Sequence, residues 1–206
     1  IGTIATSGQY LYDMASADFN NDGNRDFVAS GKSIALYLYL GNGNGTFTQA
    51  SLQMPSQSVY IYGKTAADVD GDGKADLIVG TTAGTIFFYK GKGDGTFLPP
   101  VQVGNIGSGE VYGLTAGDFD GDGKVDIIAS KRYYSVTSYL LKGRGDGTFQ
   151  APSIISSLGD LNTYTAFDSG DFNNDGNLDL LTATWTGKTI DFYPGNGNGT
   201  FGLKTN

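Results

Sequence analysis

The sequence has no cysteine and no histidine among its 206 residues. Without cysteine there are no disulfides, no thiolate nucleophiles and no zinc sites built from thiolates. Without histidine the commonest general base and the commonest imidazole metal ligand are missing. No run of about 18 apolar residues occurs, so we expect no membrane insertion. Any metal site in this chain must therefore be built from oxygen ligands.

Positive charge is also scarce, and negative charge is unevenly placed. The chain has 13 basic and 21 acidic residues, and its formal net charge is −8. The absence of a basic stripe argues against nucleic acid as a partner. Of the 21 acidic residues, 14 lie in four short segments, and four divalent cations bound there would bring the formal charge to zero. We interpret this acidity as metal ligands.

These four segments are copies of one acidic loop. The first three copies begin 50 residues apart and the last begins 53 residues later, which is the signature of a repeat protein. The copies are DFNNDGNRD (18–26), DVDGDGKAD (68–76), DFDGDGKVD (118–126) and DFNNDGNLD (171–179).

Each repeat predicts four short strands. A short apolar run such as DLIVG follows the loop, then an aromatic-rich run such as TIFFYK, then a glycine turn such as GKGDGTF. Four strands at this period are typical of a β-propeller blade, and helix is expected to be nearly absent. The phenylalanine after each turn is expected to pack between neighbouring blades. These four residues are Phe47, Phe97, Phe149 and Phe201.

The sequence therefore predicts one all-β domain over residues 1–206, a propeller of four four-stranded blades. Residues 1–8 resemble the end of an outer strand, so we expect them to complete the last blade, within one chain or between two. Closure within one chain would give a four-bladed ring, closure between chains a larger ring, and open joining a filament. The expected blades are 9–58, 59–108, 109–159 and 160–206.

Each acidic loop is interpreted as a calcium site, about four ions in all. Oxygen ligands at alternate positions with a glycine at the sharp turn suit a hard cation that takes six to eight oxygens. The second and third loops carry four carboxylates, whereas the first and fourth have asparagine at the third position, so the second and third are expected to bind more tightly. The predicted ligands are Asp18, Asn20, Asp22, Asn24 and Asp26; Asp68, Asp70, Asp72, Lys74 and Asp76; Asp118, Asp120, Asp122, Lys124 and Asp126; and Asp171, Asn173, Asp175, Asn177 and Asp179.

The residues DFNNDGNLDLL, DVDGDGKADLIVG and GKGDGTF resemble FG-GAP (VCBS-type) repeats, and the resemblance covers essentially the whole chain. It implies calcium in the four loops, an extracellular or cell-surface setting and a role in adhesion or ligand binding, and it implies no enzymatic activity. Family members usually have about seven blades, so four blades raise the prospect of closure between chains or of a fragment.

A ligand site is expected on the face opposite the calcium loops. Flat aromatic rings with polar edges suit sugar rings and protein contacts, although inter-blade packing is an alternative role for the same tyrosines. The candidates are Tyr12, Tyr62, Tyr112, Tyr133 and Trp185.

Three functions follow. The first is a secreted, non-catalytic module that binds an extracellular glycan or protein. The second is a structural subunit that self-associates into a filament or surface layer. The third is a glycoside-cleaving enzyme, which would need a carboxylate pair from Asp13, Asp160, Asp168 and Asp191; no two of these recur at one repeat position, so we expect no enzyme. Asn44 and Asn198 begin glycosylation sequons, and their use depends on the source.

Overall fold

The chain is all-β, as the sequence predicts. A computed structural model describes residues 11–31, 36–52, 59–133, 135–158, 165–184 and 188–204. Over these residues the strands form four antiparallel sheets, and the one helical element is a short 3₁₀ turn at Ser156–Leu158. None of the described helical structure is long and apolar enough to cross a membrane.

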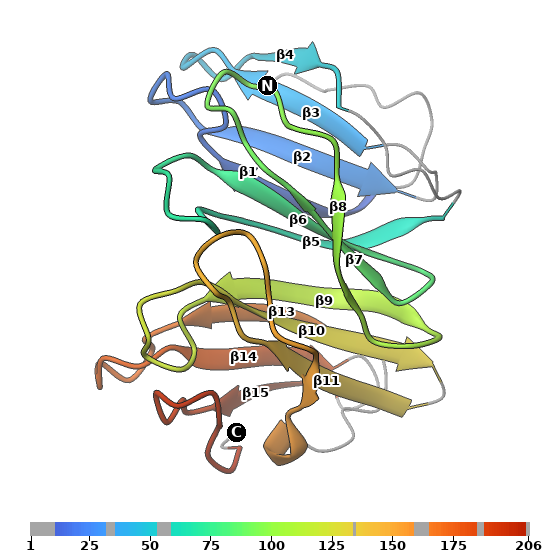
Figure 1. The fold of residues 1–206 in the computed structure, drawn as a ribbon, viewed down its shortest axis with the longest axis vertical. Helices are drawn as coiled ribbons and strands as arrows, with labels where there is room; N and C mark the ends of the chain where they lie inside the picture. Colours follow the sequence, from blue (N-terminus) through green and yellow to red (C-terminus); the bar gives the residue numbers. More distant parts are fainter. Residues whose placement is uncertain are drawn as a thin grey trace.

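Each sheet is a meander whose strands lie side by side in chain order (Figure 1). The first sheet holds β1 (Leu11–Ala17), β2 (Asp26–Gly31), β3 (Leu36–Gly41) and β4 (Phe47–Ala50). The second holds β5 (Ile61–Ala67), β6 (Asp76–Thr81), β7 (Thr85–Tyr89) and β8 (Val101–Asn105). The third holds β9 (Glu110–Gly117), β10 (Asp126–Tyr133), β11 (Ser135–Leu141) and β12 (Ser153–Ile154), and the fourth holds β13 (Thr165–Gly170), β14 (Asp179–Thr184) and β15 (Thr189–Tyr193).

The fourth sheet has three described strands where the others have four. The sequence predicts that residues 1–8 complete its outer strand, but residues 1–10 lie outside the part of the chain that the structure describes.

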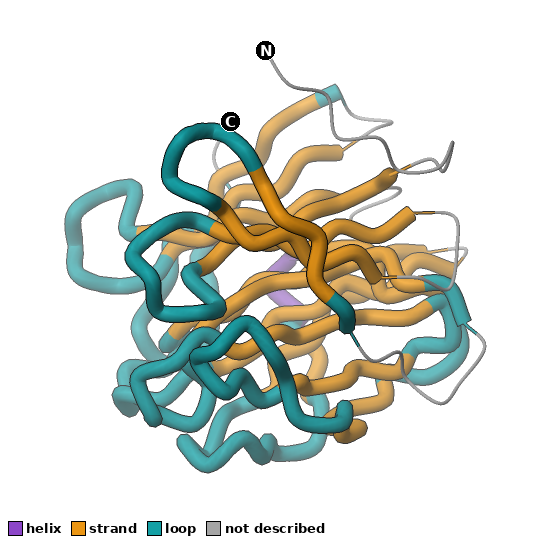
Figure 2. Tube along the Cα trace, turned by 90° about the horizontal axis from the view of Figure 1, so that it is seen from above, coloured by secondary structure: helices purple, strands orange, loops and turns teal. Residues whose placement is uncertain are grey.

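The four sheets pack face to face in series. The first strands are neighbours in the order β1, β5, β9 and β13, and among the described residues β1 and β13 make no comparable contact with each other. The first and fourth sheets accordingly lie at opposite ends of the molecule (Figure 1). In the view from above, the strands run between loops at the two ends of the sheets (Figure 2).

One apolar cluster fills each of the three junctions between sheets. Strands β6 and β7 of the second sheet are buried along their whole length because a sheet covers each of their faces. The first cluster includes Val28 of the first sheet and Leu77 of the second, and the second includes Ile78 and Ile127 of the second and third sheets. The third includes Ile128 of the third sheet and Leu180 of the fourth. Burial of apolar area at these three junctions is the main source of stability.

The phenylalanine after the glycine turn packs against the preceding sheet in three repeats. The ring of Phe97 lies 5.3 Å from that of Phe19, and the ring of Phe201 lies 6.1 Å from that of Phe119. Phe149 belongs to the cluster between the second and third sheets. Phe47 differs from the prediction: it is 39% exposed and packs on Phe27 of its own sheet, because no described sheet precedes the first.

Candidate metal centres and a pocket between the first strands

Each acidic loop joins the first strand of a sheet to the second and is folded around its first aspartate. Asp68 accepts backbone hydrogen bonds from Asp72 (3.0 Å) and Gly73 (2.8 Å). Gly73 has φ of 80°, a conformation that glycine adopts without a Cβ penalty. The same pair of bonds recurs in the other three loops, where Asp18, Asp118 and Asp171 are the acceptors.

The last aspartate of each loop is buried and ties the loop to the glycine turn. Asp76 accepts the backbone N–H of Val69 (2.9 Å) on one oxygen and that of Gly91 (2.7 Å) on the other. Each oxygen keeps a second lone pair that can serve a cation. In the other repeats the donors are Phe19 and Gly41 to Asp26, Phe119 and Gly143 to Asp126, and Phe172 and Gly195 to Asp179.

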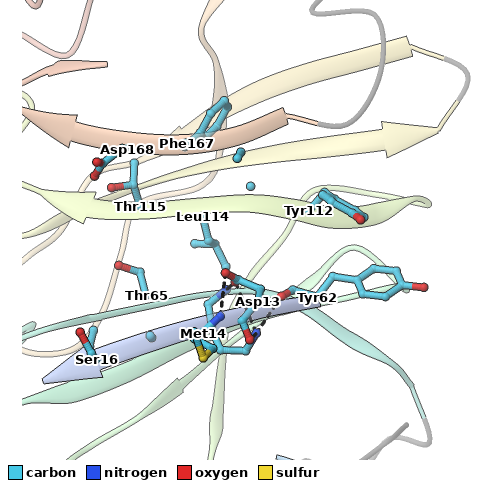
Figure 3. A pocket seen from close by; sticks show the side chains of 15 residues that line it. Asp13, Met14, Ser16, Tyr62, Thr65, Tyr112, Leu114, Thr115, Phe167 and Asp168 are labelled. Carbon is cyan, nitrogen blue, oxygen red and sulfur yellow. Dashed lines mark hydrogen bonds and ion pairs between the residues drawn. The ribbon is translucent and has the colours of Figure 1, made fainter. Parts of the chain in front are cut away.

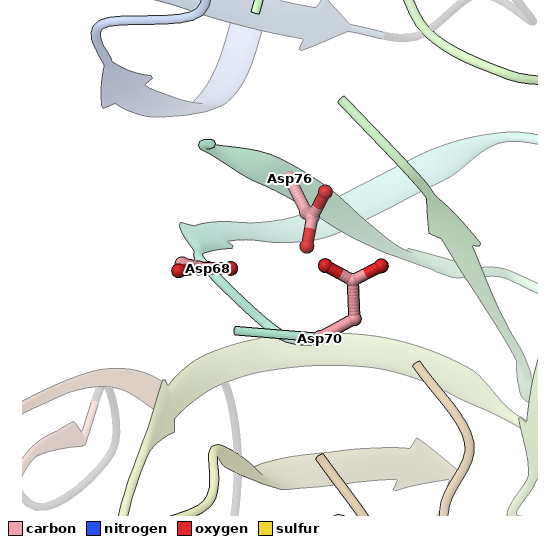
Figure 4. A group of neighbouring side chains, drawn as sticks. All are labelled: Asp68, Asp70 and Asp76. Atoms are coloured by element: carbon pink, nitrogen blue, oxygen red, sulfur yellow. The ribbon is translucent and has the colours of Figure 1, made fainter. Parts of the chain in front are cut away.

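Two of the loops gather three carboxylates tightly enough to hold a metal ion. In the second loop, oxygens of Asp68, Asp70 and Asp76 lie within 4.8 Å of one another (Figure 4). The third loop gathers Asp118, Asp120 and Asp126 in the same way.

Electrostatics in these clusters favour a bound cation. Burial raises the pKa of Asp76 to about 6, and the charges of Asp70 and Asp72 add to this effect, whereas the two backbone N–H groups oppose it. The pKa of Asp126 is raised to about 6 for the same first cause. One oxygen of Asp70 is buried with no hydrogen-bond partner. A hard divalent cation would satisfy that oxygen and offset the crowded negative charge.

The first and fourth loops are arranged differently at their third position. The Asn20 amide donates to Asp22 (2.9 Å), and the Asn173 amide donates to Asp175 (2.9 Å). In these two loops an amide N–H thus occupies an oxygen of the carboxylate that would otherwise bind the cation. Over the described residues, groups of three carboxylates suited to a metal occur in the second and third loops.

Two lysines that the sequence analysis did not consider lie against the tight clusters. Lys90 contacts Asp70 and lies 3.0 Å from Asp72, and Lys142 Nζ lies 2.7 Å from Asp120. Both lysines occupy the position just before the first glycine of the turn, where the first sheet has Leu40 and the fourth has Pro194. Hydrogen bonds to Asp70 and to Asp120 raise the pKa of Lys90 and of Lys142, respectively. The lysines are therefore charged neighbours of the proposed cation sites.

The remaining predicted ligands lie around the same loops. Asp72 accepts hydrogen bonds from the backbone N–H and the ammonium group of Lys74. Asp122 accepts the same two bonds from Lys124. Asp22 and Asp175 accept the backbone N–H of Asn24 and Asn177. That Asn24, Lys74, Lys124 and Asn177 supply a ligand to the ion stays a prediction.

A pocket of about 280 Å³ lies where the first strands of all four sheets converge (Figure 3). Its polar lining comes from hydroxyl and carboxyl groups on β1, β5, β9 and β13. Thr65 lines the pocket beside Thr115, whose hydroxyl is 2.7 Å from that of Ser169. The carboxyl groups at the pocket are Asp13 and Asp168.

Lys64 is the buried cation of this pocket. Its ammonium group is fully covered, lies 3.3 Å from a carboxylate oxygen of Asp13, and donates to the carbonyl oxygens of Asp13 and Tyr62, both at 3.0 Å. Burial lowers the pKa of Lys64 to about 8, although Asp13 opposes the shift. The pair links β1 to β5 across the first junction.

Replacing Lys64 with methionine should remove a pH-dependent part of the stability. Because its pKa is lowered from 10.5 to about 8, the unfolded chain binds more protons here between these pH values, so the wild type gains stability as pH rises. The gain between pH 8 and 9.5 should be about 1.6 kcal/mol. Urea unfolding of wild type and Lys64→Met across this range measures the change in the free energy of unfolding. Burial raises the pKa of Tyr89, and the range stops below the pH at which that tyrosine also changes the stability. Parallel curves for the two proteins would contradict the expectation.

Tyr62 and Tyr112 of the predicted ligand site lie together at one end of the pocket (Figure 3). Their ring centroids are 5.3 Å apart, and the Arg132 guanidinium lies 5.6 Å from the centre of the Tyr112 ring. Both rings are partly exposed. The other three candidates are Tyr12 and Tyr133, whose side chains lie outside the described part, and Trp185, which lies outside the described residues altogether.

Comparison with known proteins agrees with the repeat. The sequence model of the FG-GAP-like repeat matches residues 18–79, 68–129 and 131–182. A search of curated protein sequences found no similar protein. Among solved structures, one described as showing recognition of non-reducing terminal N-acetylglucosamine by an Agrocybe aegerita lectin aligns with a TM-score of 0.65 at 21% identity. The alignment covers 92% of this chain and 50% of that one, so this chain spans about half the length of the lectin, and at this identity the likeness concerns the fold. Because the three repeat matches together cover well over half of its residues, this chain belongs to the FG-GAP-like repeat family.

Proposed function

We propose that the chain is a secreted, calcium-stabilised and non-catalytic module that binds an extracellular glycan. The observation that carries the proposal is the pocket between the first strands, which combines hydroxyl and carboxyl groups with two adjacent tyrosine rings. Sugars present many hydroxyls on a ring with apolar faces. A site of this composition can hydrogen-bond the hydroxyls and cover one face of the ring.

Calcium is the proposed metal because every available ligand is oxygen. The carboxylate clusters of the second and third loops supply the hard donors that calcium prefers, and the unpartnered oxygen of Asp70 supports the same choice. Calcium at each of the four loops is part of the proposal. The ions would hold the loop between two strands and stabilise the folded state, without taking part in a reaction.

The proposed architecture is that of β-propeller blades, one for each sheet. Support comes from the antiparallel meanders, from the first strands that converge on one pocket, and from the fold shared with the lectin. The lectin also supports the choice of ligand, since its structure is described as showing recognition of non-reducing terminal N-acetylglucosamine. A protein ligand at the same tyrosines is the alternative within this function.

The absence of catalysis is likewise a proposal. Of the four carboxylates considered for glycoside cleavage, Asp13 and Asp168 line the pocket, but Asp13 is engaged by Lys64. Asp191 is buried and bonded to Lys204 (2.8 Å), and Asp160 lies outside the described residues. Incubation with a polysaccharide panel should release no reducing sugar.

Tyr112→Ala should weaken glycan binding by at least about fivefold, because truncating a side chain that anchors an interface costs more than about 1 kcal/mol. A glycan array that includes terminal N-acetylglucosamine identifies the probe, and isothermal titration with that glycan measures Kd. Tyr60→Ala is the matched control, since Tyr60 is 43% exposed and is not among the pocket residues. Equal affinity for both variants, at unchanged melting temperature in calcium, would reject the pocket as the site.

A structural role is the second candidate function. The exposed apolar faces at the two ends of the sheet series favour it.

A further inference from the structure

The two end faces of the sheet series are the unpaired halves of the junction that occurs three times inside the molecule. We call the side of a sheet that packs on the next sheet along the chain its forward face. The side that packs on the preceding sheet is its backward face. Among the described residues no sheet covers the backward face of the first sheet or the forward face of the fourth, and we call these two faces free.

Repeat positions that are buried in the other sheets are exposed on the free forward face of the fourth sheet. Phe19, Val69 and Phe119 are at most 2% exposed, whereas the equivalent Phe172 of the fourth sheet is 45% exposed. On the third strand, Leu36 and Ile86 are at most 6% exposed, whereas the equivalent Ile190 is 68% exposed. An apolar surface of this kind is a place where other protein surfaces dock.

The free backward face shows the same change. Met14 is 63% exposed, whereas the equivalent Lys64 and Leu114 are buried at 4% and 6%. Phe47 is 39% exposed, whereas Phe149 and Phe201 are buried. In the interior these positions are covered by the forward face of the preceding sheet.

The two free faces match each other at several positions for which an internal junction supplies a template. Phe172 and Phe47 occupy the positions of the pair Phe119 and Phe201. Phe192 and Gly45 occupy the positions of the internal pair Phe88 and Gly147. Gly147 packs so closely on the Phe88 ring that a Cβ would lie 2.8 Å from it, whereas a Cβ on Gly45 would have nothing within 4 Å.

Polar groups match as well. Inside, the carbonyl of Phe119 accepts the N–H of Gly199 (2.8 Å), and the equivalent groups on the free faces are the Phe172 carbonyl and the Gly45 N–H. The hydroxyl pair of Thr115 and Ser169 corresponds to Asp168 and Ser16, both exposed, where the hydroxyl can donate to the carboxylate.

From this match we propose that the free forward face of one chain docks on the free backward face of a second copy. The contact joins unlike faces, so it repeats head to tail. Two copies joined at both ends would form a ring of eight sheets, within the range of about four to eight blades that propellers use. The inference rests on the end faces, of which Met14, Ser16 and Asp168 also line the pocket.

The first test is the mass of the chain in solution with calcium, by sedimentation at several concentrations. We expect a concentration-dependent assembly, and Ile190→Asp should raise the dissociation midpoint at least about tenfold. Ile154→Asp is the matched control, because Ile154 is 63% exposed on the outer strand β12 of the third sheet and should leave the midpoint unchanged. A folded monomer at about 100 µM would overturn the proposal and assign the faces to another partner.

A second test distinguishes a head-to-tail contact from a symmetrical one. The chain has no cysteine, so Phe47→Cys and Phe172→Cys each carry a single thiol. A short bis-maleimide should link the two variants when they are mixed and should link neither variant to itself. Self-linking of either variant alone, or no linking in the mixture with both variants folded by circular dichroism, would overturn the head-to-tail arrangement.

Discussion

Replacing Asp126 with alanine is expected to lower the free energy of unfolding by about 3 kcal/mol in calcium-free solution. The carboxylate accepts the backbone N–H groups of Phe119 (3.1 Å) and Gly143 (2.8 Å), and it is completely buried. Alanine would leave both buried donors without a partner. Part of this cost is offset because the substitution also removes a buried charge whose pKa is raised to about 6. Urea denaturation with EGTA present measures the change.

Asp122→Ala provides the control in the same loop. Asp122 is exposed and accepts the backbone N–H of Lys124 (3.0 Å), so its loss should cost less than about 1 kcal/mol. If Asp126→Ala fails to fold, Asp126→Asn tests the same idea, because the amide keeps one acceptor oxygen and should fall between the two. Equal effects of Asp122→Ala and Asp126→Ala would show that the tie to the glycine turn contributes little.

The strands were predictable because the repeat places the same pattern four times. The apolar run after each loop and the aromatic run before each glycine turn became the second and third strands. The predicted run TIFFYK at 85–90 is β7 over Thr85–Tyr89. A single copy of this short pattern would have been ambiguous, whereas four copies in register left few alternatives to antiparallel strands.

The double role of the last loop aspartate could not be read from the loop alone. Its second partner is the first glycine of the turn, 15 residues away for Asp76 and Gly91. The same contact explains that glycine, which has no positive φ and instead lets the backbone approach the carbonyl of Ala75, where a Cβ would clash. The later glycines of the turn differ, since Gly93 and Gly95 have positive φ.

The buried Lys64 was also missed, although a signal existed. The equivalent positions hold Met14, Leu114 and Phe167, so the repeat pattern favours an apolar residue there. Lysine is tolerated because Asp13 of the preceding sheet, 51 positions earlier, receives its ammonium group. Comparing repeats position by position would have raised the question, but only the packing of one sheet on the next shows the partner.

The exposure of Phe47 is informative for the same reason. All four turn phenylalanines were expected to pack between blades because their local sequences are alike. In the structure three of them are covered by the preceding sheet, and Phe47 is not. Burial in a repeat protein depends on the neighbouring repeat, so identical segments differ at the ends of an array.

Calcium at about 100 times its Kd should raise the melting temperature by about 10–20 °C. Two sites saturated to this degree contribute about 5 kcal/mol, and each kcal/mol corresponds to about 2–4 °C in a chain of this size. We expect the second and third loops to dominate, because their carboxylates are already gathered in the fold. Isothermal titration counts the tight sites, and thermal unfolding with calcium or EGTA measures the shift.

Substitutions that copy one repeat into another identify the sites. Asp70→Asn gives the second loop the asparagine that the first and fourth loops carry at their third position. The fold already accommodates that residue there, so the variant should fold and should lose one tight calcium site.

Lys90→Leu copies Leu40 and removes the ammonium group that lies 3.0 Å from Asp72. It should therefore lower the Kd for calcium at the second loop. The same change should destabilise the calcium-free protein, because Asp70 then loses its ammonium partner and Asp72 keeps only that of Lys74. Four equal sites, or tighter binding at the first and fourth loops, would mean that carboxylate number does not set affinity here. Weaker binding by Lys90→Leu would mean that the lysine organises the cluster and does not compete with the ion.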